Sequence, residues 1–408
     1  MQNSQKHDKF KRLLLILPAF IPLLPIRISS PLLVTWALLS LLYYCFLPKK
    51  RIPFSKSLLL PIAIFFLYLL SWPFSNDSIK HVQLIERSLA WLFIPLACWM
   101  ASINKKEEWM RIVSYFSFGL FTLLFVSHSY TISFISHQPT LDVASLTYQY
   151  RTYFESTSHL HPAYASLFSG LAISFFAIRF FESLQLKLKL CNALLATLTF
   201  LSTLLLASRM ALAATIIVFL ILILFHLHKI KEGICLLFLF AVVGFFFSIK
   251  TPFVSERMKE VNSEAFQLPI KKTQNTLSIR TGIYTCAIHL LQDHWLFGIT
   301  PGDLQNQLNN CYVEIDAPEL AKIKYNTHNE YLNYWLSFGV LGLIALLALL
   351  FIPFWQSYQT KNILFFCFLI LIIVSILSEN IFSRQNGLFF FLIFYCSGTL
   401  FIANENLK

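Results

Sequence analysis

Three basic side chains are the strongest candidates for chemistry in this sequence: Arg209, Arg280 and His328. Arg209 lies in LLLASRMALAATII, where a tight connection between two apolar segments would hold it close to a membrane core. A guanidinium group presents a planar fork of N–H donors that fits phosphate oxygens. A neutral imidazole can accept a proton. The residue types therefore indicate phosphate binding combined with proton acceptance.

His328 precedes an apolar segment in KYNTHNEYLNYWLSFGVLGL. Thr327 and Glu330 have the S/T-x-x-E spacing of a capping box, which predicts a helix that starts here with His328 in its first turn. The positive end of the helix dipole would keep the imidazole neutral, and the same helix end can bind an anion. The ordinary alternative is an interfacial histidine without a chemical role.

Arg280 begins the stretch RTGIYTCAIHLLQDH, and Ser278 is in the right place to cap a helix that starts here. At 3.6 residues per turn, Arg280, Tyr284 and Ile288 would share one helix face. The ordinary alternative is a solvated surface arginine.

Two further segments carry charged candidates. Asp303 in GITPGD is the loop acid of most interest, although a carboxylate beside a glycine more often caps a turn. Glu379 and Arg384 in SENIFSRQNG would lie at the same side of the membrane as the long loop, where they form either an ion pair or a substrate contact.

No metal site is expected. His289, His294 and His328 lack ligand spacing such as HExxH, and no P-loop is present. The eight cysteines show no CxxC pattern. Cys286 and Cys311 fall in the long loop and would be able to pair if it faces an oxidising compartment, although nothing in the sequence requires it.

The elements that must position these residues are membrane-spanning helices. Hydrophobic residues make up 57% of the 408 residues and charged residues only 13%, against about 25% charged in soluble domains. Phe occurs 42 times, and the mean hydropathy is +0.64. Apolar runs of about 20 residues, enough to cross the hydrocarbon core, recur along the chain. A soluble protein is therefore excluded.

About twelve spans are expected in an all-α fold. They cover residues 11–29, 31–48, 57–74, 88–104, 110–136, 161–182, 189–207, 210–227, 233–249, 331–354, 361–378 and 387–403. The chain then divides into helices one to nine (1–249), a large, partly helical loop (250–330) and helices ten to twelve (331–408). We expect short helices in the loop because structureless segments of such length are uncommon.

Basic residues predict the orientation of these spans. With the N-terminus inside, the short inner segments and the tail hold eighteen Lys and Arg residues and the short outer loops hold six. This asymmetry places both termini in the cytoplasm and the 250–330 loop outside. Arg209 then lies on the side where basic residues are disfavoured, which argues against the ordinary role of an arginine that extends to lipid headgroups.

Several fragments resemble the conserved region of the O-antigen ligase and polymerase superfamily. RTGIYTCAIHLLQDHWLFGITPGD is similar to its Arg-led helix and Gly-rich turn. THNEYLNYWLSFGVLG is similar to its H-N pair and G-x-x-G helix, with His328, Asn329, Gly339 and Gly342. The SR of LLLASRMAL resembles the arginine at the outer end of an earlier helix. The motifs span about residues 200–345, and Pro301 in the turn departs from the usual pattern.

LHPAYASLF and SENIFSRQNGLFFF are similar to family members from Bacteroidetes-type bacteria. The resemblance implies a GT-C-like, metal-independent, inverting glycosyltransferase of lipopolysaccharide biosynthesis, without a cofactor. It would move a glycan from undecaprenyl diphosphate to a lipid A-core acceptor at the periplasmic face of the bacterial inner membrane. Arg209 and Arg280 would hold the diphosphate and His328 would act as the base. The other predicted substrate contacts are Tyr284, Asp303, Asn329 and Arg384.

Two other functions are considered. An O-antigen polymerase uses the same donor and transfers to another lipid-linked glycan, and the motifs barely separate it from a ligase. A lipid-linked oligosaccharide flippase would have short loops throughout and charged residues inside the bundle, whereas this sequence has a long loop and clean apolar spans. Nucleic acid is not an expected partner, because the basic residues occur as short clusters between spans.

Overall fold

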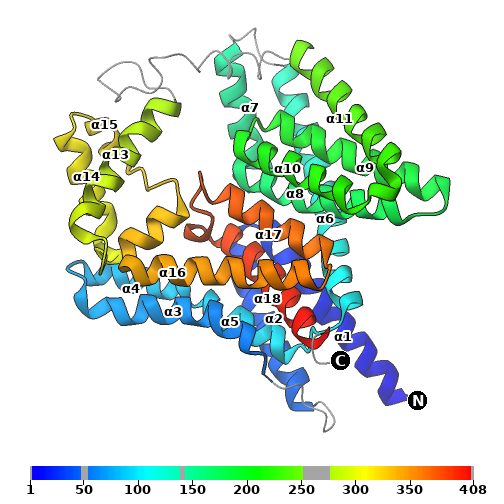
Figure 1. The fold of residues 1–408 in the computed structure, drawn as a ribbon, viewed down its shortest axis with the longest axis horizontal. Coiled ribbons are helices and arrows are strands. Elements are labelled where there is room, and N and C mark those ends of the chain that lie inside the picture. The colour runs from blue at the N-terminus through cyan, green and yellow to red at the C-terminus, as the bar shows by residue number, and fades with distance from the viewer. Residues whose placement is uncertain (1, 47–53, 138–142, 251–275, 406–408) are drawn as a thin grey trace.

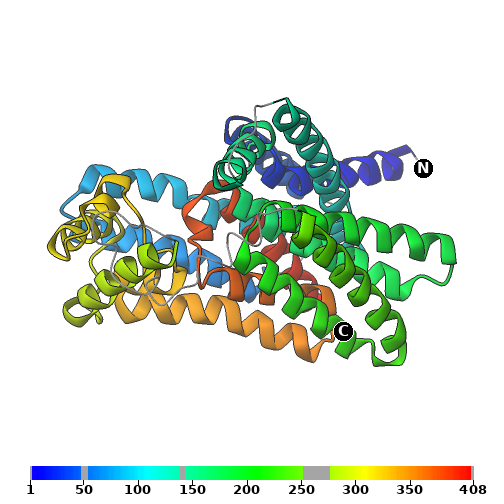
Figure 2. The same cartoon turned by 90° about the horizontal axis from the view of Figure 1, so that it is seen from above.

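In the computed structural model, the described residues (2–46, 54–137, 143–250 and 276–405) form helices and no strands. Most helices run roughly along the long axis of the molecule (Figure 1). Three helices, α13 (Thr276–His294), α14 (Pro301–Glu314) and α15 (Pro318–Ile323), gather at one end. Both chain termini lie toward the other end in both views (Figures 1 and 2). We call the end with α13–α15 the loop-side end.

The remaining helices form the bundle itself. The first part contains α1 (Gln2–Phe20), α2 (Ile26–Phe46), α3 (Leu59–Ser71), α4 (Ser78–Ser88), α5 (Ala90–Met100), α6 (Lys106–Ser136), α7 (Val143–Ser158), α8 (Pro162–Glu182), α9 (Leu186–Leu205), α10 (Arg209–Phe225) and α11 (Ile230–Lys250). The last part contains α16 (Glu330–Gln359), α17 (Ile363–Ser375) and α18 (Gln385–Glu405).

Eight helices of the described chain are long and apolar enough to cross a membrane, or nine if the bent pair α10 and α11 is one span. The all-α polytopic fold is therefore confirmed. The count is lower than the predicted twelve for physical reasons. The first half of α1 is polar, and α17 has 13 residues, about 20 Å at 1.5 Å per residue. Helices α10 and α11 were predicted as two spans. They meet at a 94° bend, and only the pair together is long and apolar enough to cross a membrane.

Helices α8 and α18 lie at the centre of the bundle. In each of these two helices, 94% of the apolar stretch is buried inside the protein, against 22–44% in the other spans. Their phenylalanines pack ring against ring with neighbouring helices, as Phe168 and Phe390 do at 4.2 Å between centroids. A helix buried on all sides must be apolar on all sides. Part of the high Phe content therefore fills the protein interior rather than facing lipid.

The predicted loop 250–330 is helical in its described part, while residues 251–275 lie outside the described residues. Helices α13–α15 share a hydrophobic core of their own, to which α16 contributes Leu336. Two helices of the described residues were not expected from the sequence. Helix α4 occupies the connection between the third and fourth predicted spans, and α7 occupies the connection between the fifth and sixth.

A close backbone contact fixes α13 and α14 against α16. Gly298 and Gly339 both have positive φ angles, 78° and 66°, and the Ile299 N–H donates to the Leu336 carbonyl at 2.6 Å. A Cβ atom on Gly339 would overlap the Leu296 carbonyl, and one on Gly298 would overlap the backbone of Gly339. The close approach of the two segments therefore requires glycine at both positions. Helix α16 is kinked at Gly339.

A disulfide joins Cys286 in α13 to Cys311 in α14, a pairing that the sequence left open. Replacing Cys286 and Cys311 with Ser should lower the free energy of unfolding by about 2–4 kcal/mol, because a cross-link limits the freedom of the unfolded chain. Thermal unfolding of the purified variant would measure the loss. Cys191→Ser, which removes an exposed free cysteine, is the control. Equal melting temperatures for the wild type and the double variant would contradict the prediction.

Candidate active site

A cavity of about 410 Å³ opens among α8, α10, α13 and the connection between α17 and α18. Its lining includes the charged side chains of Arg151, Arg209, Arg280 and Glu379, together with the imidazole of His328. Three of these are the residues that the sequence marked as catalytic, although they are far apart along the chain. Most of the other lining residues are apolar, from Ala163 to Ile381. The cavity therefore combines an excess of positive charge with an apolar surface.

Helix boundaries bring Arg209 to the cavity. Arg209 is the first residue of α10, and only Leu206, Ala207 and Ser208 separate it from α9. Ala207 has φ 49°, which turns the chain sharply between the two helices. A side chain on so short a connection has little freedom to move away, which is the situation that the sequence predicted.

His328 lies just before α16 and not in its first turn. The N-cap is Asn329, whose side chain accepts a backbone N–H of the first turn at 3.1 Å. Thr327, the predicted cap, accepts a hydrogen bond from the Asn380 amide at 3.0 Å, and Glu330 accepts a backbone N–H from the same connection. These tertiary partners replace the capping box. His328 itself has φ 43°.

Helix α13 carries Arg280 past the predicted cap. The helix already includes Thr276, so Ser278 lies inside it rather than at its start. The Tyr284 hydroxyl, one turn after Arg280, lies 3.5 Å from the His328 carbonyl oxygen. Burial raises the pKa of the Tyr284 phenol above its usual value, so this group acts as a neutral donor. Tyr284 thereby holds α13 beside the segment that carries His328.

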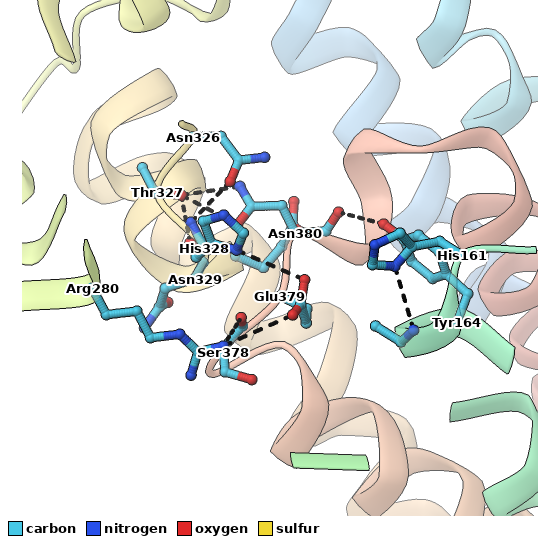
Figure 3. Close-up of polar contacts among 12 residues, drawn as sticks. His161, Tyr164, Arg280, Asn326, Thr327, His328, Asn329, Ser378, Glu379 and Asn380 are labelled. Carbon is cyan, nitrogen blue, oxygen red and sulfur yellow. Dashed lines mark hydrogen bonds and ion pairs between the residues drawn. The ribbon is translucent and has the colours of Figure 1, made fainter. Parts of the chain in front are cut away.

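Glu379 lies between two of the three catalytic candidates, Arg280 and His328. Its carboxylate lies 3.8 Å from Arg280 Nη2 and 3.8 Å from His328 Nδ1. Burial alone would raise the pKa of Glu379, but the contact with His328 and the charges of Arg280 and His161 outweigh it and lower the pKa. Figure 3 shows Glu379 between His328 and His161. A charged carboxylate therefore faces both an arginine and a histidine.

Residues 194–347 match the family model described as O-antigen ligase. This match supports the O-antigen ligase superfamily for the stretch that it covers, which is less than half of the chain. No curated protein matches it significantly. The matched range contains Arg209, Arg280 and His328 but ends before Glu379. The family pattern therefore covers only part of the cavity, and Glu379 and Arg151 are added by the three-dimensional structure.

His161 and Pro162 form the start of α8, which agrees with the predicted span over residues 161–182. His161 Nδ1 accepts the Ala163 N–H at 3.3 Å, and burial lowers the pKa of the imidazole. One ring nitrogen is thus occupied by a structural role.

Asp303 lies outside the cavity and has a positioning role instead of the predicted substrate contact. Its carboxylate accepts the backbone N–H groups of Asn76 and Asp77 at 2.9 Å each and the Thr300 hydroxyl at 2.9 Å. Burial alone would raise the pKa of Asp303, but these hydrogen bonds have the larger effect, and the pKa lies below its usual value. Asp303 therefore attaches the start of α14 to the segment before α4.

Arg384 and Asn329 also lie apart from the 410 Å³ cavity. Arg384 lines a second cavity, and Glu379 pairs with Arg280 and His328 rather than with Arg384 among the described residues. Asn329 is occupied as the α16 cap. Of the six predicted substrate contacts, Arg209 and Arg280 line the cavity directly, and Tyr284 supports its wall.

Among the described residues, one cluster of side chains consists of residue types that can bind a metal ion. His289, Cys311 and Glu314 have ligand atoms within 4.8 Å of one another. The Cys311 sulfur is bonded to Cys286, which leaves only His289 and Glu314 as donors. Zinc sites in proteins typically have three or four protein ligands. We assign no metal to this group.

Proposed function

We propose that this chain is an O-antigen ligase that transfers a glycan from undecaprenyl diphosphate to a lipid A-core acceptor. The observation that supports the proposal is the cavity in which Arg151, Arg209 and Arg280 lie near His328. Lipid diphosphate is already a good leaving group, so the reaction needs positive charge at the diphosphate and a base at the acceptor. The cavity offers both kinds of group.

The arginines would hold the diphosphate. The charge that develops on the leaving diphosphate is stabilised most by donors fixed in advance in a site of low polarity. Arg280 is already held at the cavity, since it lies 3.8 Å from Glu379 and its side chain is 27% exposed. A diphosphate would take over part of this contact and so draw Arg280 toward the donor.

His328 would accept the proton of the acceptor hydroxyl. The Glu379 carboxylate, 3.8 Å from His328 Nδ1, would fix the ring and stabilise the charge that it gains, as in other base–carboxylate pairs. The hydroxyl oxygen then attacks the anomeric carbon while the bond to the diphosphate breaks. Direct displacement inverts the anomeric configuration, and no metal ion is needed in this mechanism.

We place the cavity on the periplasmic side of the inner membrane, with both termini in the cytoplasm. The distribution of Lys and Arg supports this orientation. The Cys286–Cys311 disulfide supports it as well, because disulfides persist in the periplasm and are rare in the cytosol. The loop-side end is where polymerised glycan and completed core would meet.

Arg280→Ala should lower the transfer rate by about 100- to 1000-fold, the usual effect of removing one donor to a developing anion. The assay uses purified protein, an undecaprenyl-diphosphate-linked glycan and a lipid A-core acceptor. Arg179→Ala is the matched control, since Arg179 is exposed and pairs locally with Glu182. Full activity of Arg280→Ala would refute the assignment.

Lipopolysaccharide gels from a deletion strain separate ligase from polymerase. A ligase deletion should leave bare core while lipid-linked polymer accumulates. A band of core plus a single repeat unit would instead identify an O-antigen polymerase, which uses the same donor. An unchanged ladder would show that neither reaction on this glycan is the function.

A further inference from the structure

A second cavity of about 300 Å³ lies among α4, α14, the start of α16 and the start of α18. Its long polar side chains are Lys80, Arg87, Gln305, Asn326, Asn333 and Arg384. None of the residues that line it is acidic. It uses none of the residues that line the first cavity.

The two cavities share a wall made of two chain segments. In the segment before α16, His328 lines the first cavity and Asn326 lines the second, and the His328 N–H donates to Asn326 Oδ1 at 3.0 Å. In the segment before α18, Glu379 lines the first cavity and Arg384 the second. A molecule in the second cavity would therefore lie one backbone segment away from the proposed base.

The cations of the second cavity form no ion pair with the described residues. Within the described chain, Lys80, Arg87 and Arg384 have no ion-pair partner within 4.0 Å. Asp77 and Asp303 attract Lys80, although neither forms an ion pair with it. Hydrogen bonds from Asn76, Asp77, Ser75 and Thr300 already occupy the carboxylate oxygens of Asp303. Cations that converge without a counter-charge are suited to an anionic ligand.

The rest of the lining indicates what kind of anion fits. Trp91, which is buried and contacts the Phe382 ring at 5.3 Å, lines the cavity together with Tyr68. Aromatic faces combined with amide groups suit a sugar ring, which has apolar faces and a belt of hydroxyl groups. The cavity thus combines features that fit a sugar with features that fit a phosphate.

We propose that the second cavity binds a phosphorylated saccharide of the acceptor lipid. The proposal rests on the proposed function, because an acceptor hydroxyl must reach His328 from a side that the donor diphosphate does not occupy. The shared wall allows one molecule to place a phosphate near Lys80 and Arg384 and a neighbouring hydroxyl near His328. Arg384, predicted from the sequence as a substrate contact, would then contact acceptor rather than donor.

The first test measures binding without transfer. Native mass spectrometry of the detergent-solubilised full chain would compare bisphosphorylated lipid A, the same lipid after dephosphorylation, and phosphatidylglycerol. The wild type should retain bisphosphorylated lipid A about tenfold better than the other two, and Lys80→Gln with Arg384→Gln should abolish that preference. Lys322→Gln, which changes an exposed lysine paired with Glu319, should keep it.

Two binding results would overturn the proposal. Equal retention of phosphatidylglycerol would show that the cations only attract anionic membrane lipid. An unchanged preference in the double variant would show that the phosphate binds elsewhere.

The second test measures transfer. The double variant should raise the KM for the phosphorylated acceptor about tenfold and leave the KM for the donor unchanged. With dephosphorylated acceptor, variant and wild type should have equal KM values. A shift in the donor KM alone would overturn the proposal. If the wild type prefers the phosphorylated lipid in the binding test but neither wild type nor variant transfers glycan, the proposed function is refuted. The cavity would then still be supported as a phosphosaccharide site.

Discussion

His328→Ala should lower the rate of glycan transfer by about 10²- to 10⁴-fold, the range that a positioned general base contributes. The structure gives the reason for choosing this histidine. His328 lines the same cavity as Arg209 and Arg280, and it faces the Glu379 carboxylate at 3.8 Å. The loss should appear in kcat, while donor binding stays close to that of the wild type, because the arginines are unchanged.

The measurement uses purified protein in a single-turnover assay, with donor affinity determined separately. His289→Ala is a suitable control, since His289 lies on α13 and is exposed. Glu379→Gln should give a smaller loss, because the isosteric amide removes the charge that stabilises protonated His328 but leaves the ring in place. A His328→Ala enzyme that keeps wild-type kcat would require a different base.

The sequence predicted the three central residues because their signals are local. Arg209 follows a helix end and His328 precedes a helix start. Arg280 begins a recognisable motif in an amphipathic helix. Resemblance to the superfamily then combined them into one site. The all-α membrane fold followed from composition and run length alone, since bilayer thickness sets how long an apolar helix must be.

What the sequence missed depends on contacts between distant segments. Glu379 was considered either as an ion-pair partner for nearby Arg384 or as a substrate contact, whereas its partners come from α13 and from the segment before α16. The Thr327 capping box failed for the same reason, since Asn380 offered Thr327 another partner. The break of α16 at Gly339 was not predicted either, because it depends on backbone hydrogen bonds with residues 296–300.

Gly339→Ala should prevent most of the protein from reaching its folded state. Gly339 has φ 66° and ψ −160° inside α16, a conformation open to glycine and costly to other residues by about 1–3 kcal/mol. The added Cβ would also overlap the Leu296 carbonyl, which belongs to rigid backbone rather than to a movable side chain. The backbone strain and the overlap add, and together they remove a large part of a total stability of about 5–15 kcal/mol.

Gly244→Ala is the matched control for this change. Gly244 also lies in an apolar helix, but the nearest atom to an added Cβ is Leu204 Cδ1 at 3.9 Å, an ordinary contact. Size-exclusion profiles of membrane extracts and the melting temperature of purified protein would compare the two variants. Wild-type yield and melting temperature for Gly339→Ala would contradict the prediction.

The same substitution tests how the site is held together. The contact between Gly298 and Gly339 fixes the end of α13 against α16. Arg280 lies in α13, and His328 lies just before α16. Any Gly339→Ala protein that does fold should therefore lose transfer activity more strongly than stability, because the distance between the arginine and the base would change. A variant with reduced melting temperature but full kcat would show that this backbone contact serves folding alone.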